Sequence, residues 1–104
     1  MHMVVDDHKE FAKQWLRLGS HEAELNRIDT AIVAAARTGT PLPSLAVIFG
    51  ALSDASIASA DALETCVATP VPVHVRNSLL RLQCSMTDVA ISLKLYTTLT
   101  VRPG

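Results

Sequence analysis

Apolar residues between Pro70 and Arg102 recur with alternating gaps of four and three residues, the heptad pattern of a helix that packs lengthwise against other helices. This first stripe consists of Val75, Leu79, Leu82, Met86, Val89, Leu93 and Tyr96. A second stripe consists of Leu80, Cys84, Ile91, Leu95 and Leu99. At about 100° per residue the two stripes lie roughly 160° apart. The pattern predicts a long C-terminal helix with two apolar faces.

A helix on the outside of a monomeric domain needs only one apolar stripe. The second stripe has two interpretations: the helix is central and wrapped by others on both sides, or the stripe contacts a second copy or another protein. Residues 93–101 also alternate between apolar and polar, which suits a strand that pairs across a dimer. A lone strand has no pairing partner in a helical chain, so we predict helix to about Thr98.

Two shorter helices are predicted at the N-terminus. Asp7 and Glu10 form a variant of the capping box at the start of the first, and Gly19 is placed as its C-terminal stop. Ser20 caps the second, which ends before Gly39. The apolar face of the first is formed by Phe11, Trp15 and Leu18, and that of the second by Leu25, Ile28, Ile32 and Ala35.

A third helix is predicted from Pro43 or Ser44 to about Val67, between two turns that contain proline. Its large apolar residues are Leu45, Ile48, Phe49, Leu52, Ile57, Leu63 and Val67. Small residues fill its middle, which lets neighbouring helices approach closely. The expected fold is therefore all-α, a single domain over residues 1–104 built as a bundle of about four helices.

Composition suggests that apolar surface is covered by something. The chain of 104 residues is 49% hydrophobic but only 18% charged, below the roughly 25% typical of soluble domains. With a net charge of −1 and no basic patch, direct nucleic-acid binding is not expected. Charges throughout the first nineteen residues argue against a signal peptide. The apolar run at residues 45–52 is far shorter than the ~20 residues that span a bilayer, so we expect a cytoplasmic protein with no membrane contact.

No residue constellation specifies a reaction. The run His21-Glu22-Ala23-Glu24 inverts the Glu-x-x-His pattern of di-iron bundles and occurs once, so we interpret it as capping residues. Asp54, Asp61 and Glu64 are expected to form the solvated side of the third helix. His8 and His74 have no catalytic partner in sequence, and Cys66 and Cys84 are interpreted as buried free thiols. No catalytic residue, cofactor or metal site is predicted.

The remaining signal is protein association. The candidate contact residues are Leu80, Cys84, Ile91, Leu95, Leu99, Phe11, Trp15, Ile48 and Phe49. Aromatic residues dominate interface hot spots. A tryptophan in an apolar stripe is first of all a core residue, so the core is the favoured location for Trp15. For the second stripe, a symmetric dimer across Leu80, Ile91, Leu95 and Leu99 is one of the open interpretations.

In size and character the chain resembles the small helical anti-activators of quorum-sensing transcription factors, the QslA and TraM type. The shared features are about one hundred residues, no DNA-binding patch and a long final helix, here from Leu79-Leu80-Arg81-Leu82 through Leu93-Lys94-Leu95. The resemblance implies a cytoplasmic homodimer that binds a LuxR-type regulator and blocks its dimerisation and DNA binding. It assigns no functional residue, because no motif can be matched position by position.

Two other classes remain open from the sequence. One is a small helical enzyme or metal-binding bundle that uses His8, His21 or His74. The other is a self-assembling structural or immunity protein. Metal analysis of the purified protein distinguishes the first, and the identity of co-purifying proteins distinguishes the second.

Overall fold

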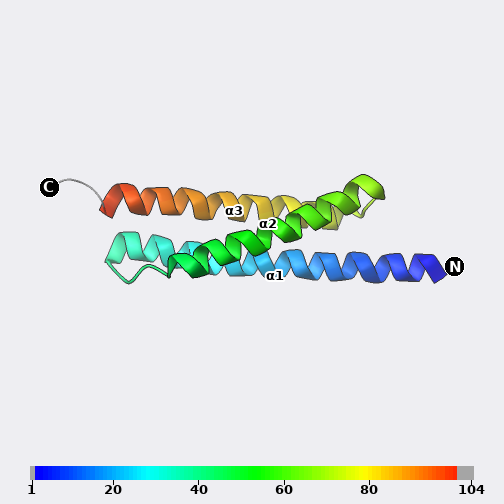
Figure 1. The fold of residues 1–104 in the computed structure, drawn as a ribbon, viewed down its shortest axis with the longest axis horizontal. Coiled ribbons are helices and arrows are strands. Elements are labelled where there is room, and N and C mark those ends of the chain that lie inside the picture. The colour runs from blue at the N-terminus through cyan, green and yellow to red at the C-terminus, as the bar shows by residue number, and fades with distance from the viewer. Residues whose placement is uncertain (1, 101–104) are drawn as a thin grey trace.

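The computed structural model describes the backbone of residues 2–100 and the side chains of residues 11–100. That part of the chain forms three helices: α1 (His2–Thr38), α2 (Leu45–Ala68) and α3 (Val73–Thr100). They build a rod with extents of 67 × 20 × 19 Å. Figure 1 shows that α1 and α3 run in the same direction and that α2 crosses obliquely between them in the opposite direction. The most extensive helix pairing joins α1 to α3.

The all-helical prediction is confirmed, but the predicted division of the N-terminal half into two helices is wrong. α1 is continuous from His2 to Thr38 and passes through Gly19. A glycine stops a helix by adopting the left-handed conformation, and Gly19 does not have a positive φ. A glycine inside a helix destabilises it by about 0.5–1 kcal/mol relative to alanine. At Gly19 the burial of Leu18 and Leu25 on either side offsets this cost. Asp7 and Ser20 therefore lie inside the helix and do not cap it.

The predicted stop at Gly39 is confirmed. Gly39 has φ 73°, the left-handed conformation that favours glycine, and its N–H donates to the Ala35 carbonyl over 3.1 Å. After the proline-containing connection, Ser44 caps α2 by accepting a hydrogen bond at Oγ from the Val47 N–H, over 3.2 Å. The polar and proline residues of this connection thus set the start of α2 as the sequence indicated.

The second connection, residues 69–72, is shorter than the first, residues 39–44. The Thr69 N–H donates to the Thr65 carbonyl over 2.9 Å at the end of α2, and α3 begins at Val73 after Pro72. α3 continues without interruption to Thr100, so the helical prediction for its end is confirmed and the alternative strand is wrong over residues 93–100. Val101 lies outside the described residues.

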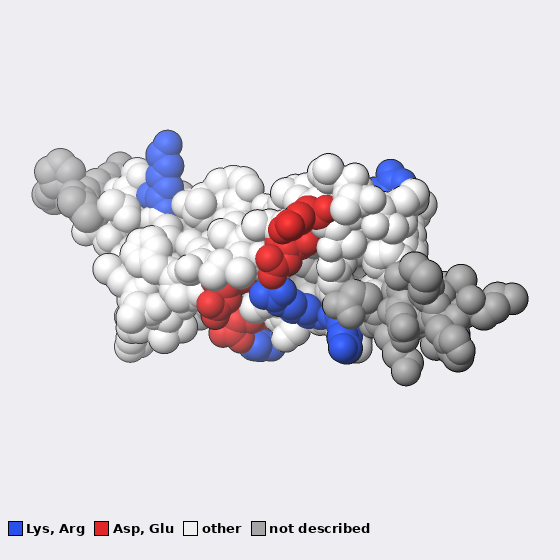
Figure 2. Space-filling view, turned by 45° about the vertical axis from the view of Figure 1, so that its right-hand side comes forward, with Lys and Arg blue, Asp and Glu red and all other residues white. Residues whose placement is uncertain are grey.

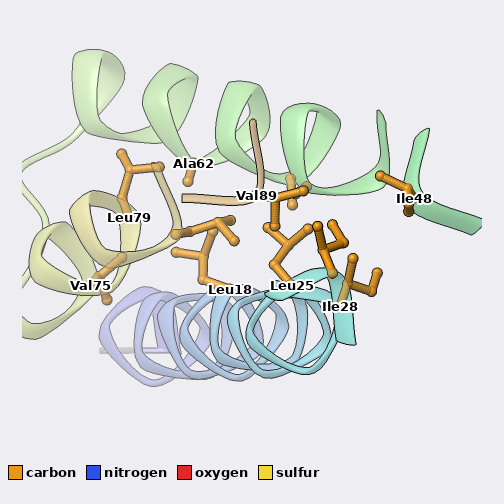
Figure 3. Packing of buried hydrophobic residues seen from close by; sticks show 12 residues of the cluster. Leu18, Leu25, Ile28, Ile48, Ala62, Val75, Leu79 and Val89 are labelled. Carbon is orange, nitrogen blue, oxygen red and sulfur yellow. The ribbon is translucent and has the colours of Figure 1, made fainter. Parts of the chain in front are cut away.

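The core is a single apolar cluster between the three helices (Figure 3). α3 contributes its first stripe: Val75, Leu82 and Val89 are completely buried, and Met86, Leu93 and Tyr96 pack against the cluster. The face predicted for the second half of α1 is also buried: Leu25, Ile28, Ile32 and Ala35. Heptad and helical spacing therefore identified the inward faces of α1 and α3 correctly.

α2 packs differently from expectation. Apart from Ile48, its buried residues are small: Ala55, Ala58, Ser59 and Ala62. Small side chains bring the backbone of α2 close to its neighbours, as the sequence suggested. The large apolar residues Leu45, Phe49, Ile57, Leu63 and Val67 are instead exposed. They face outward because the narrow groove formed by α1 and α3 accepts only alanine and serine.

Small polar residues also explain the close pairing of α1 with α3. Ser78, Ser85 and Ser92 recur every seven residues along α3 and are buried. Ser85 Oγ bonds the Asn26 amide oxygen over 3.0 Å, and Ser92 Oγ bonds the Asp29 carboxylate. One turn before Ser85, Arg81 pairs with Glu22 of α1 at 3.4 Å. These contacts form a polar ladder that fixes the register of the two parallel helices.

Candidate interaction surface

The second stripe of α3 lies on the surface. Leu80 is 58% exposed, Ile91 59%, Leu95 49% and Leu99 45%, and Cys84 is also exposed. The interpretation of α3 as a central helix wrapped on both sides is therefore wrong. α1 and α2 both pack against the first stripe, and within the described residues nothing covers the second. This apolar row is the main unpartnered feature of the molecule.

The stripe has a shallow hollow near its middle. The hollow measures about 270 Å³ and is lined by Leu80, Gln83, Cys84, Thr87 and Asp88. It arises because the short side chains of Cys84 and Thr87 lie between the larger Leu80 and Ile91. A side chain from a docked helix fits such a hollow, in the manner of a knob packing into a hole.

A second exposed apolar row follows α2. It consists of Leu45, Phe49, Leu63 and Val67, and we call it the α2 stripe. At about 100° per residue these four positions fall within about 40° of one another. They lie roughly 120° from the buried alanines. Of the four, sequence reasoning proposed only Phe49 as a contact residue. Leu45, Leu63 and Val67 could also have been proposed as contact residues from the sequence, because the large and the small apolar residues of this helix lie on different faces.

The carboxylates of α2 lie on its α1 side, away from the α2 stripe. Asp61 pairs with Arg17 of α1 at 2.8 Å. Glu64 lines a hollow together with Lys13, and Asp54 lines another together with Arg27. Figure 2 shows acidic and basic side chains gathered near the middle of this view, with separate basic side chains toward both ends.

The other predicted contact residues are distributed between core and surface. Ile48 is completely buried in the core, so its side chain is not available to a partner. Phe11 is partly buried against the core cluster. Trp15 is 44% exposed, which corrects the expectation that it is a core residue. Its ring meets the His74 ring edge-on, with centroids 5.6 Å apart. The aromatic residues therefore do not form one continuous patch with the α3 stripe.

Both cysteines are free, and the expectation that both are buried is corrected. Cys84 is exposed within the second stripe of α3, whereas Cys66 on α2 is half-buried. Cys84 is exposed because it belongs to the face of α3 that neither α1 nor α2 contacts. Its position makes it a reporter of whatever covers that face.

Residues considered for catalysis or metal binding are occupied in ordinary surface contacts. Glu22 pairs with Arg81, and Glu24 pairs with Arg27 on the same helix. Within the described residues no group of three or more His, Cys, Asp or Glu side chains could hold a metal ion. The expected capping role of residues 21–24 is wrong, because they lie inside α1. The side chain of His8 lies outside the described residues.

A hollow of about 510 Å³ lies between α1 and α2. Gln14 Nε2 donates to Thr65 Oγ1 over 2.7 Å at its wall, and the Gln14 amide oxygen is buried without a partner among the described residues. The charged residues that line it are exposed, and two of them, Arg17 and Asp61, are paired with each other. Ligand pockets are mostly apolar with a few placed polar groups, whereas this hollow is lined mainly by charged and polar side chains.

In the described part of the chain, α2 is the one helix that is long and apolar enough to cross a membrane by length and composition. Core helices of globular proteins satisfy the same criterion. α2 carries Asp54, Asp61 and Glu64, and carboxylates are rare inside membrane-spanning segments.

In comparisons with known proteins, no protein-family model, no curated protein and no solved structure matches the chain.

Proposed function

We propose that the protein is a non-enzymatic, cytoplasmic regulator that acts by binding another protein through exposed apolar helix faces. The observation that supports this most directly is the exposure of the second stripe of α3, from Leu80 to Leu99. The largest apolar patch that a typical monomer exposes is about 300–600 Å², and such patches are often functional. The stripe extends about 28 Å along the helix at about 1.5 Å per residue.

In the free protein, we propose that the stripe pairs with the same stripe of a second copy. An antiparallel arrangement places Leu80 opposite Leu95 of the second copy and Cys84 opposite its Ile91. This register brings apolar residues together along most of the stripe. A parallel arrangement instead puts both Lys94 and Asp88 at the same height in the two copies, whereas the antiparallel register does this for Asp88 alone, which lies opposite Thr87 of the second copy. The antiparallel homodimer is therefore the proposed resting form.

The size of the stripe limits the strength of this pairing. A single helix face about 28 Å long and roughly 10 Å wide offers about 300 Å², well below the roughly 800 Å² per partner of a standard stable interface. A dimer of this size dissociates readily. A second protein that offers a larger surface can then replace the second copy on the stripe.

The resemblance to the QslA and TraM type of anti-activator indicates which partner to test first. We propose that the target is a LuxR-type transcription factor. The protein would bury its apolar helix face against the surface through which the regulator dimerises. Because DNA binding by such a regulator needs its dimer, this contact would prevent DNA binding without any contact between the protein and DNA.

The test is affinity capture from the native cytoplasm, with the solution mass of the free protein measured alongside. We expect a dimeric bait to retain a LuxR-type regulator, and a Leu95→Asp bait to retain none. Thr30→Asp adds the same charge at an exposed position on α1 and is expected to behave as wild type. A bait that retains no regulator at any concentration contradicts the anti-activator proposal.

A further inference from the structure

The C-terminal half of the α2 stripe lies beside one edge of α3, whereas the first turns of α2 lie against α1 (Figure 1). Ser59 of α2 meets Met86 of α3, with Oγ 4.0 Å from Sδ, and this contact marks the side on which the two helices join. Leu63 lies about 40° from Ser59 on the α2 helix, and roughly 160° from Asp61, which contacts α1. The α2 stripe is therefore on the α3 side of α2.

Two cations lie next to this stripe. Arg76 and Lys94 are exposed and are separated by eighteen residues, which is about five helical turns, so they fall on one line about 27 Å long. Around the axis of α3, this line is about 80° from Met86, which contacts α2. It is roughly 140° from Arg81, which contacts Glu22 of α1. The two cations therefore lie toward α2 and away from α1. We call the α2 stripe together with Arg76 and Lys94 the α2–α3 face.

No carboxylate of the described residues lies on the α2–α3 face. The carboxylates of α2 lie toward α1, where Asp61 pairs with Arg17. Asp88 is the one carboxylate of α3 and falls about 20° from Arg81, on the α1 side of that helix. The face therefore combines two apolar pairs, Leu45 with Phe49 and Leu63 with Val67, with two positive charges and no negative charge. The exposed Ser56 lies on the same line between the two pairs.

We propose that the α2–α3 face binds an acidic amphipathic helix of another protein. The apolar row of that helix lies along Leu45, Phe49, Leu63 and Val67, and carboxylates about five turns apart reach Arg76 and Lys94. Laying an amphipathic helix along an apolar surface is a common mode of recognition. Complementary charges at both ends fix its register and exclude basic competitors. This inference concerns a face other than the second stripe of α3, and it names the chemistry of the partner that this face binds.

Charge decides against the two other occupants. A second copy of the chain facing this surface would bring four cations together without a carboxylate, which is unfavourable. An anionic lipid surface is recognised by clusters of about four to eight basic residues, and this face has two. The acidic helix is the occupant that both the apolar row and the charges fit.

The probe is a pair of fluorescent synthetic helices of equal length with leucine at the a and d heptad positions. One carries glutamate at two positions eighteen residues apart, and the other carries lysine at the same positions. Binding to the full chain is measured by anisotropy at low and high salt. At low salt we expect the glutamate helix to bind about tenfold more tightly than the lysine helix, because two exposed ion pairs contribute modestly and are screened by salt.

The double variant Arg76→Glu, Lys94→Glu is expected to reverse this preference. Lys13→Glu with Arg37→Glu makes the same change of charge on α1 and is expected to keep it. Leu63→Gln, at an exposed position of the α2 stripe, is expected to weaken the binding of both probe helices equally. Circular dichroism checks that each variant remains helical.

Equal affinity for the two helices overturns the inference, as does a preference that survives the Arg76 and Lys94 reversal. Binding to phosphatidylserine vesicles with no binding to either helix also overturns it, in favour of a membrane surface. If the capture experiment retains a regulator while the two helices bind equally, the proposed function stands and this inference fails. If the capture experiment retains nothing while the glutamate helix is selected, the inference about the face stands and the anti-activator proposal fails.

Discussion

Ser85 on α3 and Asn26 on α1 are joined by a side-chain hydrogen bond of 3.0 Å between residues 59 positions apart. Ser85 is buried and lies in the middle of a row of serines with a seven-residue repeat. Asn26 is exposed, so water can replace the bond on its side. The small size of Ser85 therefore contributes more to the pairing of the helices than its hydroxyl does.

Replacement of Ser85 is expected to separate these two contributions. Ser85→Ala should lower the free energy of unfolding by about 0.5–1.5 kcal/mol, the usual net value of one hydrogen bond. Ser85→Leu should cost about 1–3 kcal/mol or more, because added volume in a packed contact forces the helices apart. Urea unfolding measures both, and Thr87→Leu on the exposed side of α3 is the control. A Ser85→Leu variant as stable as wild type would contradict close α1–α3 packing.

Replacing each of the two glycines that flank the second half of α1 by alanine is expected to change the stability of the protein in opposite directions. Gly19 lies in the helix interior, and a Cβ added there meets nothing within 4 Å, so Gly19→Ala should stabilise the protein by about 0.5–1 kcal/mol. Gly39→Ala should destabilise it by roughly 1–2 kcal/mol, because φ is 73°. Thermal unfolding followed by circular dichroism reads both. Destabilisation by Gly19→Ala would instead indicate that the helix is interrupted at Gly19.

Neighbouring residues on α2 test the orientation of that helix. Ile48 is completely buried and Phe49 is 57% exposed. Ile48→Ala is expected to cost about 2–5 kcal/mol by leaving a cavity, whereas Phe49→Ala should change stability by about 0.5 kcal/mol or less. Chemical denaturation at low protein concentration makes the comparison. The reverse order would mean that α2 is rotated by about one residue relative to the core.

Leu95→Asp tests self-association. The side chain is 49% exposed, so a single chain should tolerate the charge with little change in melting temperature. In the proposed dimer the carboxylate would be buried against Leu80 of the second copy, and burying a charge in an apolar contact is unfavourable. Light scattering should therefore give a dimer mass for wild type and a monomer mass for the variant. The Thr30→Asp control is expected to remain dimeric. If the wild-type protein has the mass of a monomer even at high concentration, the proposed dimer is wrong.

Cys84 provides an independent measure of the same surface. In the free monomer its exposed thiol should react with a thiol reagent faster than the half-buried Cys66. As protein concentration rises and the α3 stripes pair, the rate at Cys84 should fall while the rate at Cys66 stays constant. Single-cysteine variants Cys66→Ser and Cys84→Ser assign the two rates. Parallel concentration dependence at both cysteines would show that the protection does not arise at the α3 stripe.

The sequence predicted the inward face of α3 because its heptad spacing is a local property that survives in the fold. Val75, Leu82 and Val89 are buried where that spacing puts them. The division at Gly19 failed because the residue type permits a left-handed turn but does not require one. Gly39 makes that turn and Gly19 does not. The difference depends on the residues downstream of each glycine, because Gly39 precedes a proline-containing connection and Gly19 precedes an uninterrupted apolar stripe.

The orientation of α2 could not be predicted from its own residues. Both the face with Leu45, Phe49, Leu63 and Val67 and the face with Ala55, Ala58 and Ala62 are apolar, and a preference for large buried residues selects the wrong one. The close α1–α3 pair leaves room only for small side chains. That constraint comes from Ser78, Ser85 and Ser92 on another helix, so it becomes visible only when the three helices are assembled.

The polar ladder between α1 and α3 also determines the order in which the molecule can fold. Its pairs, Arg81 with Glu22 and Ser85 with Asn26, are each 59 residues apart. Closing a loop of that length carries an entropy cost before any contact compensates for it, and such long-range pairing slows folding. On the ribosome, α1 is complete long before α3 emerges and has only the small-residue face of α2 to contact. The most extensive helix pair of the native state therefore cannot form until α3 has emerged.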